Sequence, residues 1–131
     1  MAESKENKEL YMELKALDEE IKKLNTLLEN VDEQLNELNS SKLILNKFSD
    51  LKSGDELRVP LTSGVYFMAK LTETKNLLVN VGAGVCVEKT PKDVLKIYDS
   101  QLLELSSYKE NLIKNMKILI ARFEKIQKKL D

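Results

Sequence analysis

The stretch NLLVNVGAGVCVEKTP, from Asn76 to Pro91, decides the fold of this 131-residue chain. Two short runs rich in valine and leucine flank Gly82-Ala83-Gly84, a pattern typical of two strands joined by a tight turn. These three residues also resemble part of a phosphate-binding glycine loop. However, Val87 stands where that motif needs its last glycine, and no helix follows directly. We therefore predict a β-hairpin here.

A second hairpin is expected just upstream of the first. Ser53-Gly54-Asp55 is a turn signal, and the runs Glu56–Leu61 and Val65–Leu71 are rich in strand-forming residues. Residues 55–89 are therefore predicted to form an insert of two hairpins.

Long helical segments lie on both sides of this insert. Apolar residues recur in alternating steps of four and three along Leu10–Leu45 and again along Tyr98–Leu130. This period predicts coiled-coil helices over residues 4–51 and 91–131. The first helix is net acidic and the second net basic. We expect them to pair antiparallel within one chain, because the tether keeps the partner helix at high effective concentration.

Two details of the helical segments carry further predictions. Thr90 followed by Pro91 is a typical helix start, with Thr90 as the N-cap. Lys42 and Lys109 each occupy one position of the otherwise apolar seam. Such residues either fix the register of the two helices or extend their charged ends out of the seam into water.

The predicted insert is incomplete by itself. Two-stranded ribbons are marginal in water, and their open edges pair with other chains. We therefore interpret the insert as an oligomerisation module whose apolar side chains meet strands of other subunits. These side chains are Val59, Val65, Phe67, Leu77, Val79, Val81, Val85 and Val87.

Short motifs in the insert carry a family resemblance. VPLTSGVY occupies residues 59–66, NVGAGV occupies 80–85 and VEKT occupies 87–90. With the order helix, two hairpins, helix, these motifs resemble the alpha-class subunits of prefoldin. The resemblance implies a mainly α fold with small β: a long antiparallel coiled-coil helix hairpin joined by two β-hairpins that assemble into an intersubunit β-barrel.

The same resemblance implies a function and partners. It implies an ATP-independent molecular chaperone, a holdase subunit that works in the cytoplasm in a hexamer with beta-class prefoldin subunits. Such a complex captures unfolded proteins with its coiled-coil tips and delivers them to a group II chaperonin.

Client contacts are expected at the free ends of the helices, where the last turns have fewer neighbours. Candidates on the seam, for which core packing is the competing interpretation, are Leu10, Leu14, Phe123 and Ile126. Candidates off the seam, where exposed apolar groups are better signs of a binding surface, are Tyr11, Met12, Ile118 and Ile120.

Composition argues against several classes of function. The chain has no histidine and one cysteine, which removes Ser-His and Cys-His nucleophilic pairs and the usual zinc sites. We expect no enzymatic activity, no metal and no cofactor. The 21 basic and 22 acidic residues nearly cancel, so nucleic acid is not an expected partner. No apolar run suits a secretory signal or a membrane span, and Cys86, among valines, is expected to be buried.

Three alternatives remain open. The hairpins could join copies of this chain alone into a structural homo-oligomer or a filament. The chain could be a subunit of an enzyme whose catalytic site lies on another chain, or an adaptor for one folded partner. Oligomer mass with and without a beta-class partner tests the first alternative, and a panel of unrelated unfolded clients tests the third.

Overall fold

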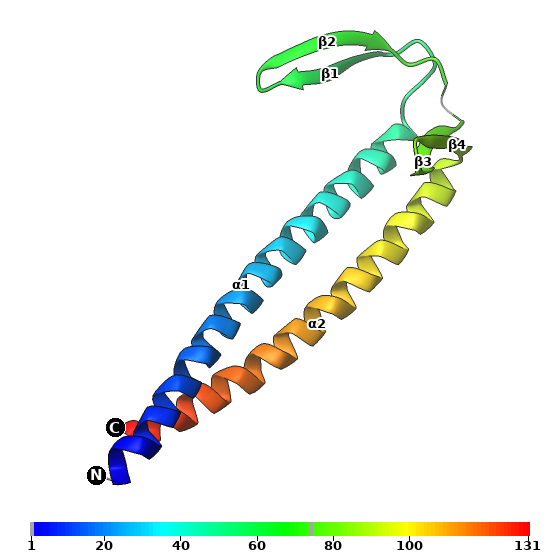
Figure 1. Cartoon of the computed structure of the whole chain (residues 1–131). Helices are drawn as coiled ribbons and strands as arrows, with labels where there is room; N and C mark the ends of the chain where they lie inside the picture. Colours follow the sequence, from blue (N-terminus) through cyan, green and yellow to red (C-terminus); the bar gives the residue numbers. More distant parts are fainter. Residues whose placement is uncertain (1, 74) are drawn as a thin grey trace. The chain divides into compact units, whose positions relative to one another are not determined.

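The computed structural model describes residues 2–73 and 75–131, with side chains from Lys5 onward. The elements in chain order are α1 (Ala2–Phe48), β1 (Glu56–Thr62), β2 (Val65–Lys70), β3 (Leu77–Gly82), β4 (Val85–Lys89) and α2 (Pro91–Leu130), all labelled in Figure 1. The expectation of two helices joined by two β-hairpins is confirmed. The β-hairpins form two separate two-stranded sheets.

The end of α1 differs slightly from the expected boundary at Leu51. The helix ends at Phe48, and the next residues form tighter turns. The N–H of Asp50 donates to the carbonyl of Lys47 at 3.1 Å, and the N–H of Leu51 donates to the carbonyl of Phe48 at 3.1 Å. Such three-residue spacing commonly tightens the last turn of a helix.

The chain divides into two compact units. Unit 1 comprises Met1–Asn36 and Leu103–Asp131, and unit 2 comprises Glu37–Leu102. Each helix contributes to both units. Unit 1 is therefore built from helix, whereas unit 2 also contains the four strands.

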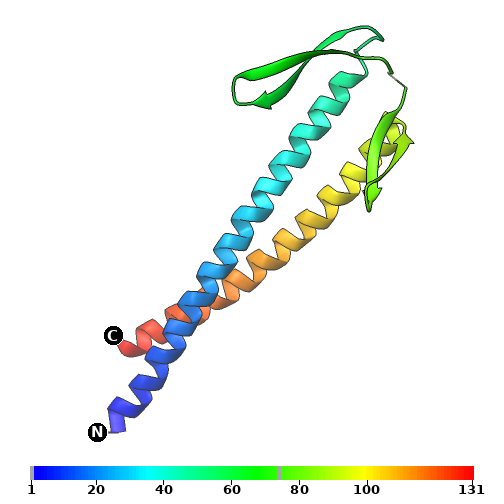
Figure 2. The same cartoon turned by 45° about the horizontal axis from the view of Figure 1, so that its top comes forward.

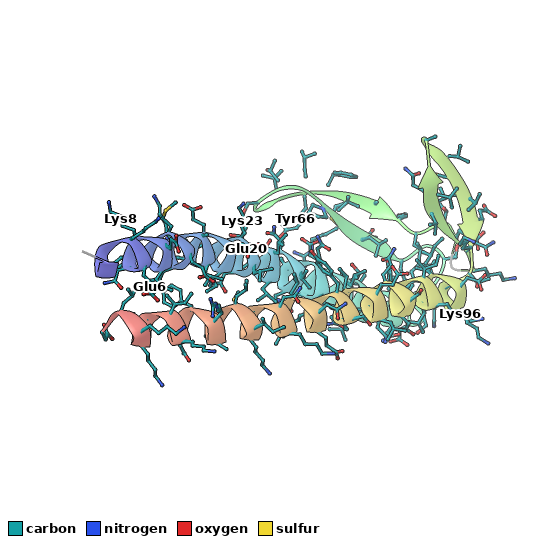
Figure 3. The ribbon with its side chains drawn as sticks, turned by 60° about the horizontal axis from the view of Figure 1, so that its bottom comes forward. Glu6, Lys8, Glu20, Lys23, Tyr66 and Lys96 are labelled. Atoms are coloured by element: carbon teal, nitrogen blue, oxygen red, sulfur yellow. The ribbon has the colours of Figure 1, made fainter. Side chains whose placement is uncertain are left out.

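Unit 1 is an antiparallel helix pair held by one apolar seam. Figures 1 and 2 place the first turns of α1 and the last turns of α2 at the same end of this unit. Charged side chains such as Lys8 point away from the other helix (Figure 3). The buried side chains all follow the predicted four-three rhythm, and they are Leu17, Val31, Leu112, Met116 and Ile126. The hydrophobic driving force is thus concentrated in a single narrow stripe.

The buried apolar side chains of unit 2 are Leu45 of α1 and Val94 of α2. Val94 lies four residues before Tyr98 and so continues the apolar rhythm to the start of α2. The predicted cap is confirmed, because the N–H of Asp93 donates to Thr90 Oγ1 at 3.2 Å. This bond satisfies one of the backbone donors that a helix start leaves free.

The two seam lysines make equivalent ion pairs between the helices. In unit 2, Lys42 Nζ of α1 lies 2.7 Å from Asp99 Oδ1 of α2. In unit 1, Lys109 Nζ of α2 lies 2.6 Å from Asp32 Oδ1 of α1. Each aspartate directly follows an apolar seam residue of the facing helix. Both lysine side chains are 36% exposed, so each extends its charged end towards water while leaving its alkyl chain in the seam.

The first hairpin has one apolar face and one mixed face. Val59 pairs with Phe67, and Leu57 pairs with Ala69, so these four side chains share a face. On the other face, the Arg58 guanidinium lies 5.9 Å from the centre of the Tyr66 ring, within cation–π range.

The second hairpin also has one apolar face and one mixed face. Val79 pairs with Val87 on the apolar face, whereas Asn80 pairs with Cys86 on the other. Cys86 is exposed, so the expectation of a buried thiol is wrong for this chain. The reason is that a two-stranded ribbon has no second layer to cover the face that carries the sulfur.

The turn of the second hairpin requires positive backbone φ at successive residues. Ala83 has a φ of 51° and Gly84 a φ of 75°, the combination of a type I′ turn. The twist of this turn matches the twist of the flanking strands. Gly82-Ala83-Gly84 is therefore a hairpin turn, as predicted, rather than a phosphate-binding loop.

Candidate functional site

The off-seam candidates are exposed apolar side chains of unit 1. Met12 is 72% exposed and Ile118 is 67% exposed, and Tyr11 and Ile120 are also exposed. Tyr11 and Met12 come from the first turns of α1, and Ile118 and Ile120 from the last third of α2. They leave the seam because they fall between its four-three positions, where a helix presents its side chains to solvent.

The seam candidates have a different environment. Leu10, Leu14 and Phe123 are half-buried, and Ile126 is 0% exposed. Ile126 is thus a core residue of the helix pair. Burying an isoleucine of this kind stabilises the pair by roughly 1.5–3 kcal/mol.

A groove runs beside the seam of unit 1, and one off-seam candidate, Ile118, lines it. Its volume is about 380 Å³, and its apolar lining comes from Leu24, Leu27, Ile118 and Leu119. Glu20, Lys23 and Asn115 supply the polar lining, and the first two are labelled on α1 in Figure 3. Ile118 is both an exposed off-seam candidate and part of the groove lining. Leu24, Leu27 and Leu119 were not predicted as site residues, because a groove between helices depends on their relative register.

A charged contact joins the helices next to the exposed apolar side chains. Arg122 Nε donates to Glu13 Oε1 at 2.9 Å, and Arg122 Nη2 donates to Glu13 Oε2 at 3.2 Å. The hydrogen bond from Arg122 lowers the pKa of Glu13, and the charges of Arg122 and Lys129 act in the same direction. Glu13 therefore stays ionised at neutral pH. This pair was not predicted, although each residue directly precedes a seam residue, where interhelical ion pairs are common.

The apolar side chains predicted for oligomerisation lie on one face of each hairpin. Val59, Val65 and Phe67 share a face of the first hairpin, and Leu77, Val79, Val85 and Val87 share a face of the second. Val81 lies where the register shifts between Asn80 and Gly82. Val65, Phe67, Val81 and Val85 are each about half exposed, and Val59, Leu77 and Val79 are partly covered.

A second hollow lies within unit 2, where the start of β3 meets the helices. It has a volume of about 210 Å³ and is lined mainly by Ile44, Phe48, Leu77 and Tyr98. Leu77 therefore packs partly against the helices of its own chain, which explains why it is better covered than its neighbour Leu78, 73% exposed.

Acidic side chains are spread over residues 2–73 and 75–131, on both helices and in the hairpins. Within that part of the chain, no group of three or more Cys, Asp or Glu side chains is arranged to hold a metal ion. Neither described helix has a stretch both long and apolar enough to cross a membrane.

The sequence and the fold have clear relatives. A family model described as Prefoldin subunit matches residues 17–131. Prefoldin subunit alpha of Thermofilum pendens is 29% identical over 128 residues and covers 97% of both chains. Prefoldin subunit alpha of Methanopyrus kandleri is 31% identical over 112 residues, or 80% of this chain and 71% of that protein. Prefoldin subunit 5 of Homo sapiens is 31% identical over 104 residues, or 79% of this chain and 68% of the human protein.

The fold is also similar to that of a solved prefoldin structure. The cryo-EM structure of filamentous PFD from Methanocaldococcus jannaschii has a TM-score of 0.78, with 20% sequence identity, over 91% of this chain and 98% of that chain. The family match covers most of α1, both hairpins and α2, which are the elements that the resemblance of the sequence implied. The chain therefore belongs to the prefoldin family.

Proposed function

We propose that the chain is a holdase subunit, which binds unfolded proteins without a nucleotide through the exposed apolar surface of unit 1. The observation that carries this proposal is the exposure of Tyr11, Met12, Ile118 and Ile120, of which Ile118 also lines an apolar groove. Unfolded chains differ from folded ones mainly in their exposed apolar side chains, and this surface offers them matching contacts.

The proposed contacts are individually weak. Burying one large apolar side chain contributes roughly 1.5–3 kcal/mol before the cost of ordering the client. Met12 suits varied clients, since its flexible side chain adapts to many partners. Several subunits around one client would multiply weak contacts through effective concentration. Weak contacts at each subunit also permit release without ATP, for transfer to a group II chaperonin in the cytoplasm.

Assembly through the hairpins is the second part of the proposal. On the apolar faces of the two hairpins, Phe67 is 51% exposed and Val87 is 37% exposed, whereas Val59 and Val79 are only partly covered. Strands from beta-class prefoldin subunits would complete these sheets into an intersubunit β-barrel. The alternative is self-assembly into a homo-oligomer or a filament through the same faces. The mass of the purified chain, alone and with a beta-class subunit, distinguishes the two.

The client surface is tested by replacing Tyr11, Met12, Ile118 and Ile120 together with serine in the assembled protein. We expect about tenfold weaker capture of a guanidinium-unfolded test protein, measured as suppression of its aggregation by light scattering, because four apolar contacts are lost. Oligomer mass should not change.

The matched control replaces Leu43 and Leu103 with serine. These leucines are equally exposed but lie elsewhere on the helices, so capture should persist. If the fourfold variant suppresses aggregation as well as the unchanged protein, this client surface is wrong. Equal losses in the variant and the control would mean that general hydrophobicity, not this site, binds clients.

A further inference from the structure

We propose that the Glu13–Arg122 ion pair is a latch that holds the terminal turns of α1 and α2 together, so that the seam side chains within one turn of it are withheld from unfolded clients. The inference rests on the proposed function and adds a regulatory contact to the same surface. It predicts two client-binding states: a closed state that uses only off-seam side chains, and an open state that also uses the seam.

The geometry of the pair distinguishes it from the other contacts between the helices. Two nitrogens of the Arg122 guanidinium, Nε and Nη2, donate to separate oxygens of Glu13, Oε1 at 2.9 Å and Oε2 at 3.2 Å. The Lys42–Asp99 and Lys109–Asp32 pairs each rest on one nitrogen. A two-pronged contact fixes direction as well as distance. Among the ion pairs of the described residues, this one also lies nearest the chain ends.

Some side chains near the latch are exposed and others are buried. Met12, next to Glu13, is exposed in the closed pair. Ile126 lies four residues after Arg122, on the same side of α2, and is fully buried although the helix ends at Leu130. Terminal turns usually fray. Full burial so close to an end indicates that the end is held closed, and opening would expose Ile126 together with the half-buried Leu14 and Phe123.

The strength of the contact suits a latch. The side chains of Arg122 and Glu13 are 42% and 41% exposed, so water and salt screen their attraction. The ion pair therefore fixes the geometry of the two side chains but contributes little free energy. A client that offers several apolar side chains can compensate for its loss.

The test compares Glu13→Gln, Arg122→Gln and the double exchange Glu13→Arg/Arg122→Glu in the assembled protein. The control Lys22→Gln breaks the Asp18–Lys22 pair, whose two residues lie on α1 alone at 3.0 Å. Two readouts are used: hydrogen exchange of the terminal-turn amides of α1 and α2, and capture of a guanidinium-unfolded test protein.

We expect each single variant to exchange faster and to capture the client about two- to fivefold more tightly, the range that loss of one exposed ion pair permits. The double exchange should restore both values, higher ionic strength should act like the single variants, and Lys22→Gln should change neither value. Unchanged exchange in both single variants would overturn the latch, and so would faster exchange without tighter capture.

Failure of the proposed function gives a different pattern. If the unchanged protein captures no client, the holdase proposal fails, whatever the exchange rates. If the unchanged protein captures the client but the single variants capture it equally well, the holdase proposal stands and the latch does not.

Discussion

Ala83 is the residue with the least favourable backbone conformation in the described chain. Its φ of 51° is in the left-handed region, where an ordinary side chain costs about 1–2 kcal/mol. Asparagine tolerates this region, and Asn-Gly is the preferred pair in a type I′ turn. We expect Ala83→Asn to stabilise the chain by about 0.5–1 kcal/mol and to raise the Tm by about 2–4 °C, measured by circular dichroism.

Ser63 provides the control for that substitution. It precedes Gly64 in the turn of the first hairpin but is not among the residues with positive φ. Ser63→Asn should therefore leave the Tm nearly unchanged. A similar rise in both variants would mean that asparagine acts through the unfolded state rather than through the strain at Ala83.

Single residues also mark the limit of what could be predicted from the sequence. The exposure of Met12 and Ile118 follows from their positions between seam residues, so it was predictable. The burial expected for Cys86 was wrong because its valine neighbours lie on the opposite face of a ribbon without a second layer. The Glu13–Arg122 contact joins residues 109 positions apart, so it depends on a helix register that the local sequence does not specify.

At the scale of the elements, the seam lysines are expected to lower the stability of the helix pair while specifying the register in which the two helices pack. Lys42 and Lys109 occupy seam positions that leucine would fill better, and their ion pairs with Asp99 and Asp32 are half-exposed. We expect the double variant Lys42→Leu/Lys109→Leu to unfold at higher urea concentration, with a gain of roughly 1 kcal/mol for each residue, because leucine buries more apolar surface. The variant should also lose specificity of pairing and form oligomers of mixed mass.

Lys22→Leu serves as the control because Lys22 points away from the seam, with its side chain 74% exposed. It should change neither the urea midpoint nor the oligomer mass appreciably. If the double variant is less stable than this control, the ion pairs rather than the apolar seam hold the helices together. If it is more stable but uniform in mass, the lysines have no role in register.

The elements themselves were the most predictable level of the fold. A sustained four-three rhythm specifies a coiled-coil seam, and turn residues at regular intervals specify hairpins. The cap at Thr90 followed from its local sequence for the same reason. The groove between Leu27 and Ile118 was not predictable, because it forms only where two helices with a particular register leave space beside their seam.

At the scale of the whole molecule, the hairpins carry apolar side chains that are about half exposed, such as Phe67 and Val85. Isolated two-stranded ribbons are marginal, so their stability in this protein is expected to come from other subunits. The pairing register defines one apolar face of each hairpin, and we propose this role for that face. Val79 and Val87 lie on that face of the second hairpin, while Leu78 and Cys86 lie on the opposite one.

The proposed interface can be tested with two substitutions, because Val79 and Leu78 are adjacent in sequence but lie on opposite faces of the hairpin. Val79→Asp would place a charge within the proposed interface, where an unpaired charge is costly. We expect it to reduce the oligomer to smaller species in light scattering coupled to size exclusion. Leu78→Asp, at a position already 73% exposed, should keep the native mass. Cys86 should likewise stay reactive towards a thiol reagent in the oligomer. Protection of Cys86 on assembly, or loss of the oligomer in Leu78→Asp alone, would place the interface on the opposite face.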